Sequence, residues 1–582
     1  MNVHEDLLLK HCQLANVYSG EIYTTDILIQ DGQVVSIDAG QSSTGARVIE
    51  CDGLFAVPGF IEPHMHLEST GLWAPELARL LVPRGTTTVV VDLTNPLHTV
   101  GPLGLRDMID AFRDLPLRSY FSIPSYAPLD PTRETAAYEL SLDDLEMMLD
   151  WTESVSIGEA VSSKVLSADD EFLARVATTL NRGLRASGHG NDLPAHDESA
   201  LDAYVASGIT DDHGTRTPAE MVSRLARGLT LFIVETPTRY NFSEGVLDHL
   251  KNNAIPTRSL QLCVDNITAR NVAADGHGYL ERPFKMAIQA GLSPIDTIRM
   301  VTLNPARYYH VEDSIGSIAP GRRADILLLE ELDKFPPKVV IVDGRIVARD
   351  GALLGSPPTE QIPDRFRDTI SLHPAVTRER LSIAAPPNRE HVRARVLALP
   401  EPGRAGNTCE IAELPVRTGR VHPDSEKDIV KFCMVERYGR NGNMAVGFAR
   451  GFGLRRGAIA SSMSLPSNNI VALGVNDDDI WTAIQHLAAI GGGNVAVADG
   501  QVLADVKLPI GGIMSTAPFE RLVDELERAD RVVHDELGSN RLTPFWTMSA
   551  TVLHTAPELG FTDRGLYNLE TDSFMSILED PS

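Results

Sequence analysis

Short apolar runs separated by turn residues flank the central part of the chain. Residues 27–37 contain two such runs joined by Asp31-Gly32, a dipeptide typical of a tight hairpin turn. A similar pattern follows much later, at 326–347. Both flanks are therefore expected to supply strands, and their spacing permits one small β-domain built from the two ends together.

Between the flanks, at about 58–314, strand-like runs alternate with runs of helical periodicity. Residues 85–92 are rich in β-branched side chains, as in a buried strand, whereas 142–151 and 171–181 have the apolar spacing of amphipathic helices. Alternation at this spacing predicts parallel β/α units. About 250 residues is also the usual length of a (β/α)8 barrel.

A proline-rich, charged segment at 355–367 reads as a linker to a third region, 368–582. This region contains two glycine-rich stretches, 442–448 and 490–495. No Gly-Lys-Ser/Thr follows either stretch, so a phosphate-binding loop is disfavoured and tight turns between strands are the better interpretation.

The composition is that of an ordinary globular protein, with 43% hydrophobic and 23% charged residues. A chain of 582 residues requires several domains. The net charge of −27 argues against nucleic acid and anionic membranes as partners. The five cysteines are scattered, which fits a reducing compartment. Without a signal-peptide pattern or an apolar run of about 18 residues, we expect a cytoplasmic protein.

The first chemical signal is a pair of histidines, His64 and His66, at the end of a short apolar run that follows Pro58-Gly59. Side chains two apart on a strand point to the same face, so both imidazoles would project together. Two such rings can bind one transition metal. Catalytic residues of α/β barrels lie at strand ends of this kind.

The stretch Pro-Gly-Phe-Ile-Glu-Pro-His-Met-His-Leu-Glu-Ser, at 58–69, resembles the first-strand signature of the amidohydrolase superfamily, in the form found in bacterial adenine deaminases. The similarity extends from about Ile27 to Met514. It implies an α/β architecture with three parts. These are a TIM-like, metal-dependent (β/α)8 barrel at 58–314, a composite β-sandwich domain of 1–57 with 315–354, and an additional α/β domain of the adenine deaminase type at 368–582.

The resemblance also implies a binuclear metal site. Glu159 matches the carboxylate that bridges the two ions; many amidohydrolases use a carboxylated lysine instead, but Lys164 is five residues further on and should have left the strand. Asp265 matches the residue that carries the proton, and Glu159 and His213 complete the implied catalytic set. Two divalent cations are expected, Mn²⁺ or Fe²⁺ first and Zn²⁺ as an alternative. The implied metal ligands are His64, His66, Glu159, His189, His213 and Asp265.

The implied reaction is the hydrolysis of adenine to hypoxanthine and ammonia, by attack of a metal-activated water on C6. The expected partners are a small heterocyclic substrate and further copies of the chain, as a homodimer or a larger homo-oligomer. The substrate side departs from the family pattern at 92–98, 190–192, Gly214 and 465–469. Two alternatives therefore stand: the same site acting on another purine or a cyclic amide, and a metal-free interaction protein with the same fold.

Overall fold

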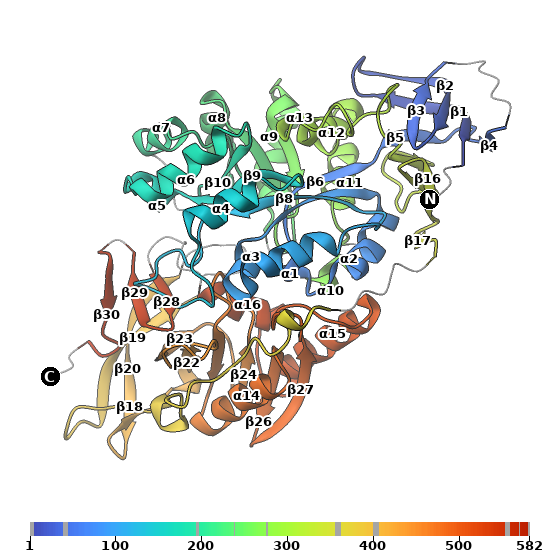
Figure 1. Ribbon diagram of the computed structural model, residues 1–582. Helices are drawn as coiled ribbons and strands as arrows, with labels where there is room; N and C mark the ends of the chain where they lie inside the picture. Colours follow the sequence, from blue (N-terminus) through green and yellow to red (C-terminus); the bar gives the residue numbers. More distant parts are fainter. Residues whose placement is uncertain are drawn as a thin grey trace.

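Strands from two distant parts of the chain form one nine-stranded sheet, at the upper right of Figure 1. β14 pairs antiparallel with β5 and thereby joins the two parts. Asp31 and Gly32 both have positive φ in the β2–β3 hairpin, as the Asp-Gly signal predicts. The strands are β1 (Leu7–Asn16), β2 (Glu21–Gln30), β3 (Gln33–Ser36), β4 (Arg47–Glu50), β5 (Phe55–Pro58), β14 (Ile326–Leu329), β15 (Val339–Val342), β16 (Arg345–Arg349) and β17 (Ala352–Leu353).

Eight parallel strands follow one another around a barrel. β6–β10 pair in order, β11–β13 do the same, and a bond from Thr210 N to Ala186 O (3.0 Å) lies between β10 and β11. A parallel bridge between Met65 and Asp265 closes the ring. The predicted TIM-like fold is confirmed. The strands are β6 (Phe60–His66), β7 (Thr86–Asp92), β8 (Arg118–Pro124), β9 (Ser154–Val161), β10 (Arg185–His189), β11 (Asp211–Asp212), β12 (Thr230–Val234) and β13 (Leu260–Cys263).

Helices surround the barrel, and their ends follow local sequence signals. The predicted helices at 142–151 and 171–181 correspond to α4 and α6, and α4 starts at a capping box made by Ser141 and Asp144. The helices are α1 (Leu67–Thr70), α2 (Ala74–Leu81), α3 (Thr94–Asp110), α4 (Leu142–Leu149), α5 (Ser162–Leu166), α6 (Asp170–Leu180), α7 (Glu198–Ala206), α8 (Pro218–Ala226), α9 (Leu247–Asn252), α10 (Ala269–Ala273), α11 (Glu281–Gln289), α12 (Pro294–Met300) and α13 (Leu303–Tyr308).

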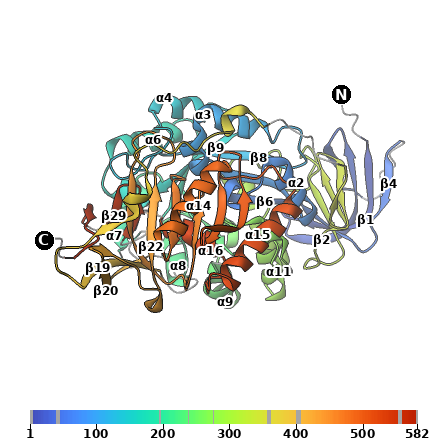
Figure 2. The same cartoon turned by 90° about the horizontal axis from the view of Figure 1, so that it is seen from below.

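The C-terminal region contains a ten-stranded sheet, with α14 (Asp477–Ala489) covering the face turned away from the barrel (Figures 1 and 2). Positive φ angles at Gly442 and at 491–493 confirm the turn interpretation, although the second turn follows a helix and not a strand. The strands are β18 (Ile383–Ala384), β19 (His391–Ala398), β20 (Thr408–Arg417), β21 (Arg420–Val421), β22 (Ile429–Val435), β23 (Met444–Arg450), β24 (Ala458–Ser461), β25 (Ile470–Gly474), β26 (Gly493–Ala498) and β27 (Gln501–Lys507).

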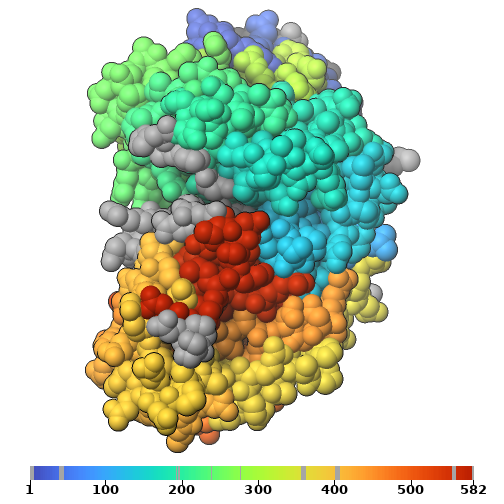
Figure 3. Space-filling model, turned by 90° about the vertical axis from the view of Figure 1, so that its left-hand side faces the viewer, coloured from blue at the N-terminus to red at the C-terminus, as the bar shows by residue number. Residues whose placement is uncertain are grey.

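The last elements of the chain pack between the C-terminal sheet and the barrel. α15 (Phe519–Asp535) and α16 (Pro544–Thr551) lie along the interface in Figure 1, and Arg270 of the barrel forms an ion pair with Asp530 of α15. β28 (Leu559–Thr562), β29 (Gly565–Asn568) and β30 (Ser573–Met575) form a small sheet, red in Figure 3, and Asp563 between its first two strands accepts a bond from Thr135 N (3.0 Å).

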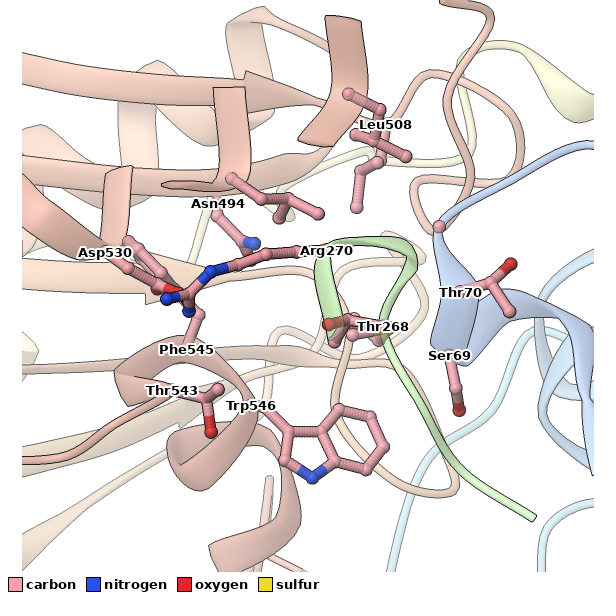
Figure 4. Close-up of a pocket in the computed structure, with 14 residues that line it drawn as sticks. Ser69, Thr70, Thr268, Arg270, Asn494, Leu508, Asp530, Thr543, Phe545 and Trp546 are labelled. Atoms are coloured by element: carbon pink, nitrogen blue, oxygen red, sulfur yellow. The ribbon is translucent and has the colours of Figure 1, made fainter. Parts of the chain in front are cut away.

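The interface encloses a small cavity that side chains of both domains line (Figure 4). Within the described part of the chain, no helix is both long and apolar enough to cross a membrane. The computed structural model describes residues 5–38, 45–191, 193, 197–237, 239–274, 277–355, 362–399, 407–552, 559–569 and 571–579.

Candidate metal centre

The six predicted ligands converge at the C-terminal ends of the barrel strands. His64 and His66 end β6, Glu159 lies near the end of β9, and His189 ends β10. His213 and Asp265 directly follow the short strands β11 and β13. All six side chains are buried. The structure therefore brings together every residue that the sequence selected for this site.

One group of candidate ligands comprises His64, His66, Glu159 and Asp265. Glu159 Oε1 lies 3.4 Å from His64 Nε2 and 3.3 Å from His66 Nε2. Asp265 Oδ1 lies 3.7 and 3.5 Å from the same two nitrogens. His64 Nε2 is buried and has no hydrogen-bond partner among the described residues. A buried nitrogen without a partner is energetically unfavourable, and a cation bound among these atoms would give it a partner.

A second group comprises Glu159, His189 and His213. Glu159 Oε2 lies 3.0 Å from His189 Nδ1, and Oε1 lies 3.3 Å from His213 Nε2. The two histidine nitrogens are 3.1 Å apart. Glu159 belongs to both groups: its Oε1 faces His64, His66 and His213, and its Oε2 faces His189. Imidazole nitrogens and carboxylate oxygens of this kind suit divalent transition metals. The donor set therefore fits the divalent cations that the family resemblance implies.

The electrostatics of the site keep Glu159 and Asp265 ionised. Burial by itself would raise the pKa of Glu159, but His189, His213 and His64 around it hold the pKa well below its usual range. For Asp265, burial is likewise outweighed, chiefly by the charge of Arg239, and the pKa is lowered. Metal ligands must be deprotonated, so both carboxylates are in the state that binds a cation.

Arg239 is a functional candidate that the sequence analysis missed. Its guanidinium forms an ion pair with Asp265 Oδ2 and donates to His213 O at 3.2 Å. Asn266 Nδ2 donates to the other oxygen, Asp265 Oδ1, at 2.7 Å. Its place in the sequence could have indicated a functional role, because Arg239 follows the barrel strand β12.

Lys164 does not take part in this arrangement. β9 ends at Val161, and Lys164 lies in α5, where its Nζ is 3.0 Å from Asp169 Oδ2. The lysine pairs with a partly exposed carboxylate outside the site.

Two of the divergent positions fit one another. Asn191 Nδ2 lies 3.1 Å from His189 Nε2, and Arg216 Nη2 lies 3.4 Å from Asn191 Oδ1. A Cβ atom at Gly214 would lie 2.7 Å from Asn191 Oδ1, which is closer than packing allows. A side chain at 214 is therefore incompatible with Asn191 in this position. Asp192, from the same divergent segment, lies outside the described residues.

The segment 92–98 also lies beside the centre. Asp92 is fully buried, and its Oδ1 accepts a bond from Thr94 N (2.8 Å) and lies 3.9 Å from His66 Nδ1. His98 places Nδ1 2.7 Å from Thr94 O, one turn back along α3. The divergent C-terminal segment reaches this helix, because Asn468 Nδ2 donates to Asn95 O at 2.9 Å.

Comparison with known proteins agrees with this geometry. The Amidohydrolase family model matches residues 55–347, and the Adenine deaminase C-terminal domain model matches 407–573. Adenine deaminase of Desulforamulus reducens is 34% identical over 564 residues, which cover 97% of this chain and 94% of the relative. Adenine deaminase 2 of Carboxydothermus hydrogenoformans is 35% identical over 586 residues, covering 98% and 97%. The chain belongs to the adenine deaminase family of the amidohydrolases.

Proposed function

We propose that the chain hydrolyses adenine to hypoxanthine and ammonia at this centre. The observation that carries the proposal is the position of Glu159, which is shared by two groups of buried nitrogen and oxygen donors. Such an arrangement would hold two cations, and their ligands would be His64, His66, Glu159, His189, His213 and Asp265. Bound divalent cations would supply a water of lowered pKa as the nucleophile.

Asp265 would transfer the proton from the attacking water to the leaving nitrogen. Asp265 is kept ionised by Arg239, so its Oδ1 can accept the proton that the water loses as the C6–O bond forms. The same oxygen then returns that proton to the exocyclic nitrogen as the C6–N bond breaks and ammonia leaves. His213, whose backbone oxygen accepts a bond from Arg239, belongs to the second ligand group and is assigned a metal-binding role first.

The direct test is to supply adenine to the metal-loaded protein and to follow both the ultraviolet spectrum and ammonia release. We expect stoichiometric conversion to hypoxanthine. The double variant His64→Ala, His66→Ala should bind well under one metal ion per chain by elemental analysis and should lose the activity. Full metal occupancy in this variant would contradict the assigned ligand set.

A second candidate is the same chemistry on another purine or on a cyclic amide. Arg216 and Asn191 favour it, because the Asn191 amide lies beside His189 and the Arg216 guanidinium lies beside Asn191. These groups donate well to an oxygen atom, which adenine lacks. A panel of aminopurines with and without ring carbonyl groups, assayed against adenine, separates the two. The third hypothesis, a metal-free interaction protein, has no support in these residues, since all six candidate ligands are present and buried.

We also propose Mn²⁺ or Fe²⁺ as the natural metal, with Zn²⁺ as the alternative, because histidine and carboxylate ligands suit all three. Metal analysis of protein purified without added metal tests this. The remaining parts of the proposal are a cytoplasmic location and a homodimer or larger homo-oligomer, which fractionation of cells and light scattering would test.

A further inference from the structure

The metal ligand His66 has a buried carboxylate beside its second ring nitrogen. Its Nε2 faces the ligand group, and its Nδ1 lies 3.5 Å from Glu68 Oε1. Glu68, in α1, is fully buried. A histidine that binds metal through one nitrogen is oriented by what lies beside the other nitrogen. Two buried carboxylates face His66 Nδ1, and Glu68 Oε1 at 3.5 Å is closer than Asp92 Oδ1 at 3.9 Å.

Glu68 is in turn held by the first turn of α3. Asn95 Nδ2 donates to Glu68 Oε1 at 2.5 Å, and both side chains are buried. No lysine or arginine forms an ion pair with Glu68 among the described residues. The amide of Asn95 is therefore the contact that fixes this carboxylate against the ring.

The C-terminal domain reaches this point through Asn468, in the loop between β24 and β25. Asn468 Nδ2 donates to Asn95 O at 2.9 Å and to Thr99 Oγ1 at 3.3 Å. Asn468 is fully buried and has a φ of 55°, a conformation that asparagine tolerates better than most residues. Its amide thus fixes the start of α3 from the other domain.

The same domain also contacts the segment that carries Glu68. Ser515 N donates to Gly71 O at 2.7 Å, and Ser515 forms a parallel bridge with Leu72. Ser69 and Thr70 form part of the wall of the interdomain cavity, opposite Asn494 and Trp546 (Figure 4). Both segments that determine the position of Glu68 are therefore packed against the C-terminal domain.

We propose that Asn95 and Asn468 are positioning residues for His66, so that the C-terminal domain helps to retain the metal in the barrel. The proposal rests on the metal-binding part of the proposed function and not on the identity of the substrate. Its structural basis is one continuous set of contacts, from Asn468 to Asn95, from Asn95 to Glu68, and from Glu68 to His66.

The test measures the affinity of the full-length chain for Mn²⁺ by competition with a chelator, without any purine present. Asn95→Ala should weaken binding about 10-fold or more, the range found when a group that orients a metal ligand is removed. Asn468→Gly removes the donor and keeps the positive φ, and should weaken binding in the same direction. Asn468→Asp keeps the size and the backbone preference but has no donor when ionised, so it should behave like Asn468→Gly.

Asn469→Ala is the matched control. Asn469 is also buried in the interface and donates to Thr135 O at 2.8 Å, but no bond joins it to Asn95. Its replacement should leave Mn²⁺ affinity within about twofold of wild type. If Asn468 and Asn469 variants lose affinity equally, Asn468 serves only to dock the domains and the proposal is wrong.

A double-mutant cycle gives the second readout. Glu68→Gln and Asn95→Ala should be non-additive in Mn²⁺ affinity, because both interrupt the same path to His66. Additive effects would overturn the proposal even if each variant binds metal weakly. A chain that retains Mn²⁺ normally but does not deaminate adenine would contradict the proposed substrate and leave this inference intact.

Discussion

The two oxygens of the Asp265 carboxylate have different partners: Oδ2 pairs with the guanidinium of Arg239, and Oδ1 lies 3.7 Å from His64 Nε2. Arg239 also donates to His213 O at 3.2 Å, so it is fixed to the loop that carries another candidate ligand. The arginine therefore both orients Asp265 and keeps it ionised. Asn266 supports the same orientation through Oδ1.

Replacing Arg239 should reduce turnover more than it reduces metal binding. Arg239→Lys keeps the positive charge but cannot bond to Asp265 and His213 together, because an ammonium lacks the planar fork. We expect kcat to fall about 10-fold in Arg239→Lys and further in Arg239→Ala, toward the roughly 10²–10⁴-fold that general acid–base catalysis contributes. Steady-state kinetics with metal content measured on the same samples checks this. Equal kcat values for the lysine variant and wild type would show that the fork geometry is unimportant.

Glu159→Gln should remove at least one of the two proposed metal ions. The substitution keeps the shape of the side chain but removes the charge that four surrounding histidines stabilise. An amide has only one oxygen and cannot serve two cations in the same way. Elemental analysis should find no more than one ion per chain, with turnover lost. Two retained ions and near-normal turnover would mean that another group is the bridge.

Asp530, at the domain interface, should make stability depend on pH. Burial raises its pKa to about 6, although the charge of Arg270 acts in the opposite direction. Between pH 4 and 6 the folded chain holds a proton on Asp530 that the unfolded chain has lost, so folding becomes less favourable as the pH rises through this window. Above about pH 6 this cost is constant.

The variant Asp530→Asn removes that dependence. The stability of the variant relative to wild type should therefore increase by about 3 kcal/mol between pH 4 and pH 6 and then level off. Thermal unfolding midpoints measured across this range give the comparison. Asp524→Asn, on the exposed side of the same helix, is the control for the effect of an Asp-to-Asn substitution in α15. A constant difference for Asp530→Asn would contradict the raised pKa.

The ligands could be predicted from the sequence because each one lies in or just after the last residues of a short strand. The topology of the barrel brings these strand ends together. His64 and His66 are two apart on β6, and Asp265 follows an apolar run that becomes β13. Local patterns of this kind can be read without knowing what lies opposite. The Asp-Gly turn between β2 and β3 was predictable for the same reason, since its positive φ angles are a local requirement.

The contacts that surround the ligands could not be predicted from local sequence patterns. Arg239 reaches Asp265 across two neighbouring strand ends, and Asn468 meets Asn95 only when the C-terminal domain docks. Such pairs are far apart in sequence and have no periodic pattern. The relation between Gly214 and Asn191 could not be predicted either. In the sequence each is a separate departure from the family pattern, whereas in the structure the Asn191 side chain occupies the space that a side chain at 214 would need.

Asp265→Asn separates the role of a ligand from the role of a proton carrier. If Asp265 only binds metal, the variant should lose affinity, and added Mn²⁺ should restore the rate. If Asp265 also moves the proton, full metal loading should leave the rate low, because an amide cannot accept a proton from water. The environment favours the second result, since Arg239 keeps the carboxylate ionised and oriented with Oδ1 toward the ligand group.

We therefore expect the fully metal-loaded Asp265→Asn variant to bind substrate almost normally and to turn over at least about 100-fold more slowly than wild type. The measurement is kcat across a Mn²⁺ titration, with bound metal determined at each point so that loading and rate are compared directly. Asn266→Ala is the matched control, because it removes a hydrogen bond to Asp265 Oδ1 but leaves the carboxylate in place. Its rate should fall much less. Recovery of Asp265→Asn to within a few-fold of wild type would reduce Asp265 to a metal ligand and make His213 the next candidate for the proton carrier.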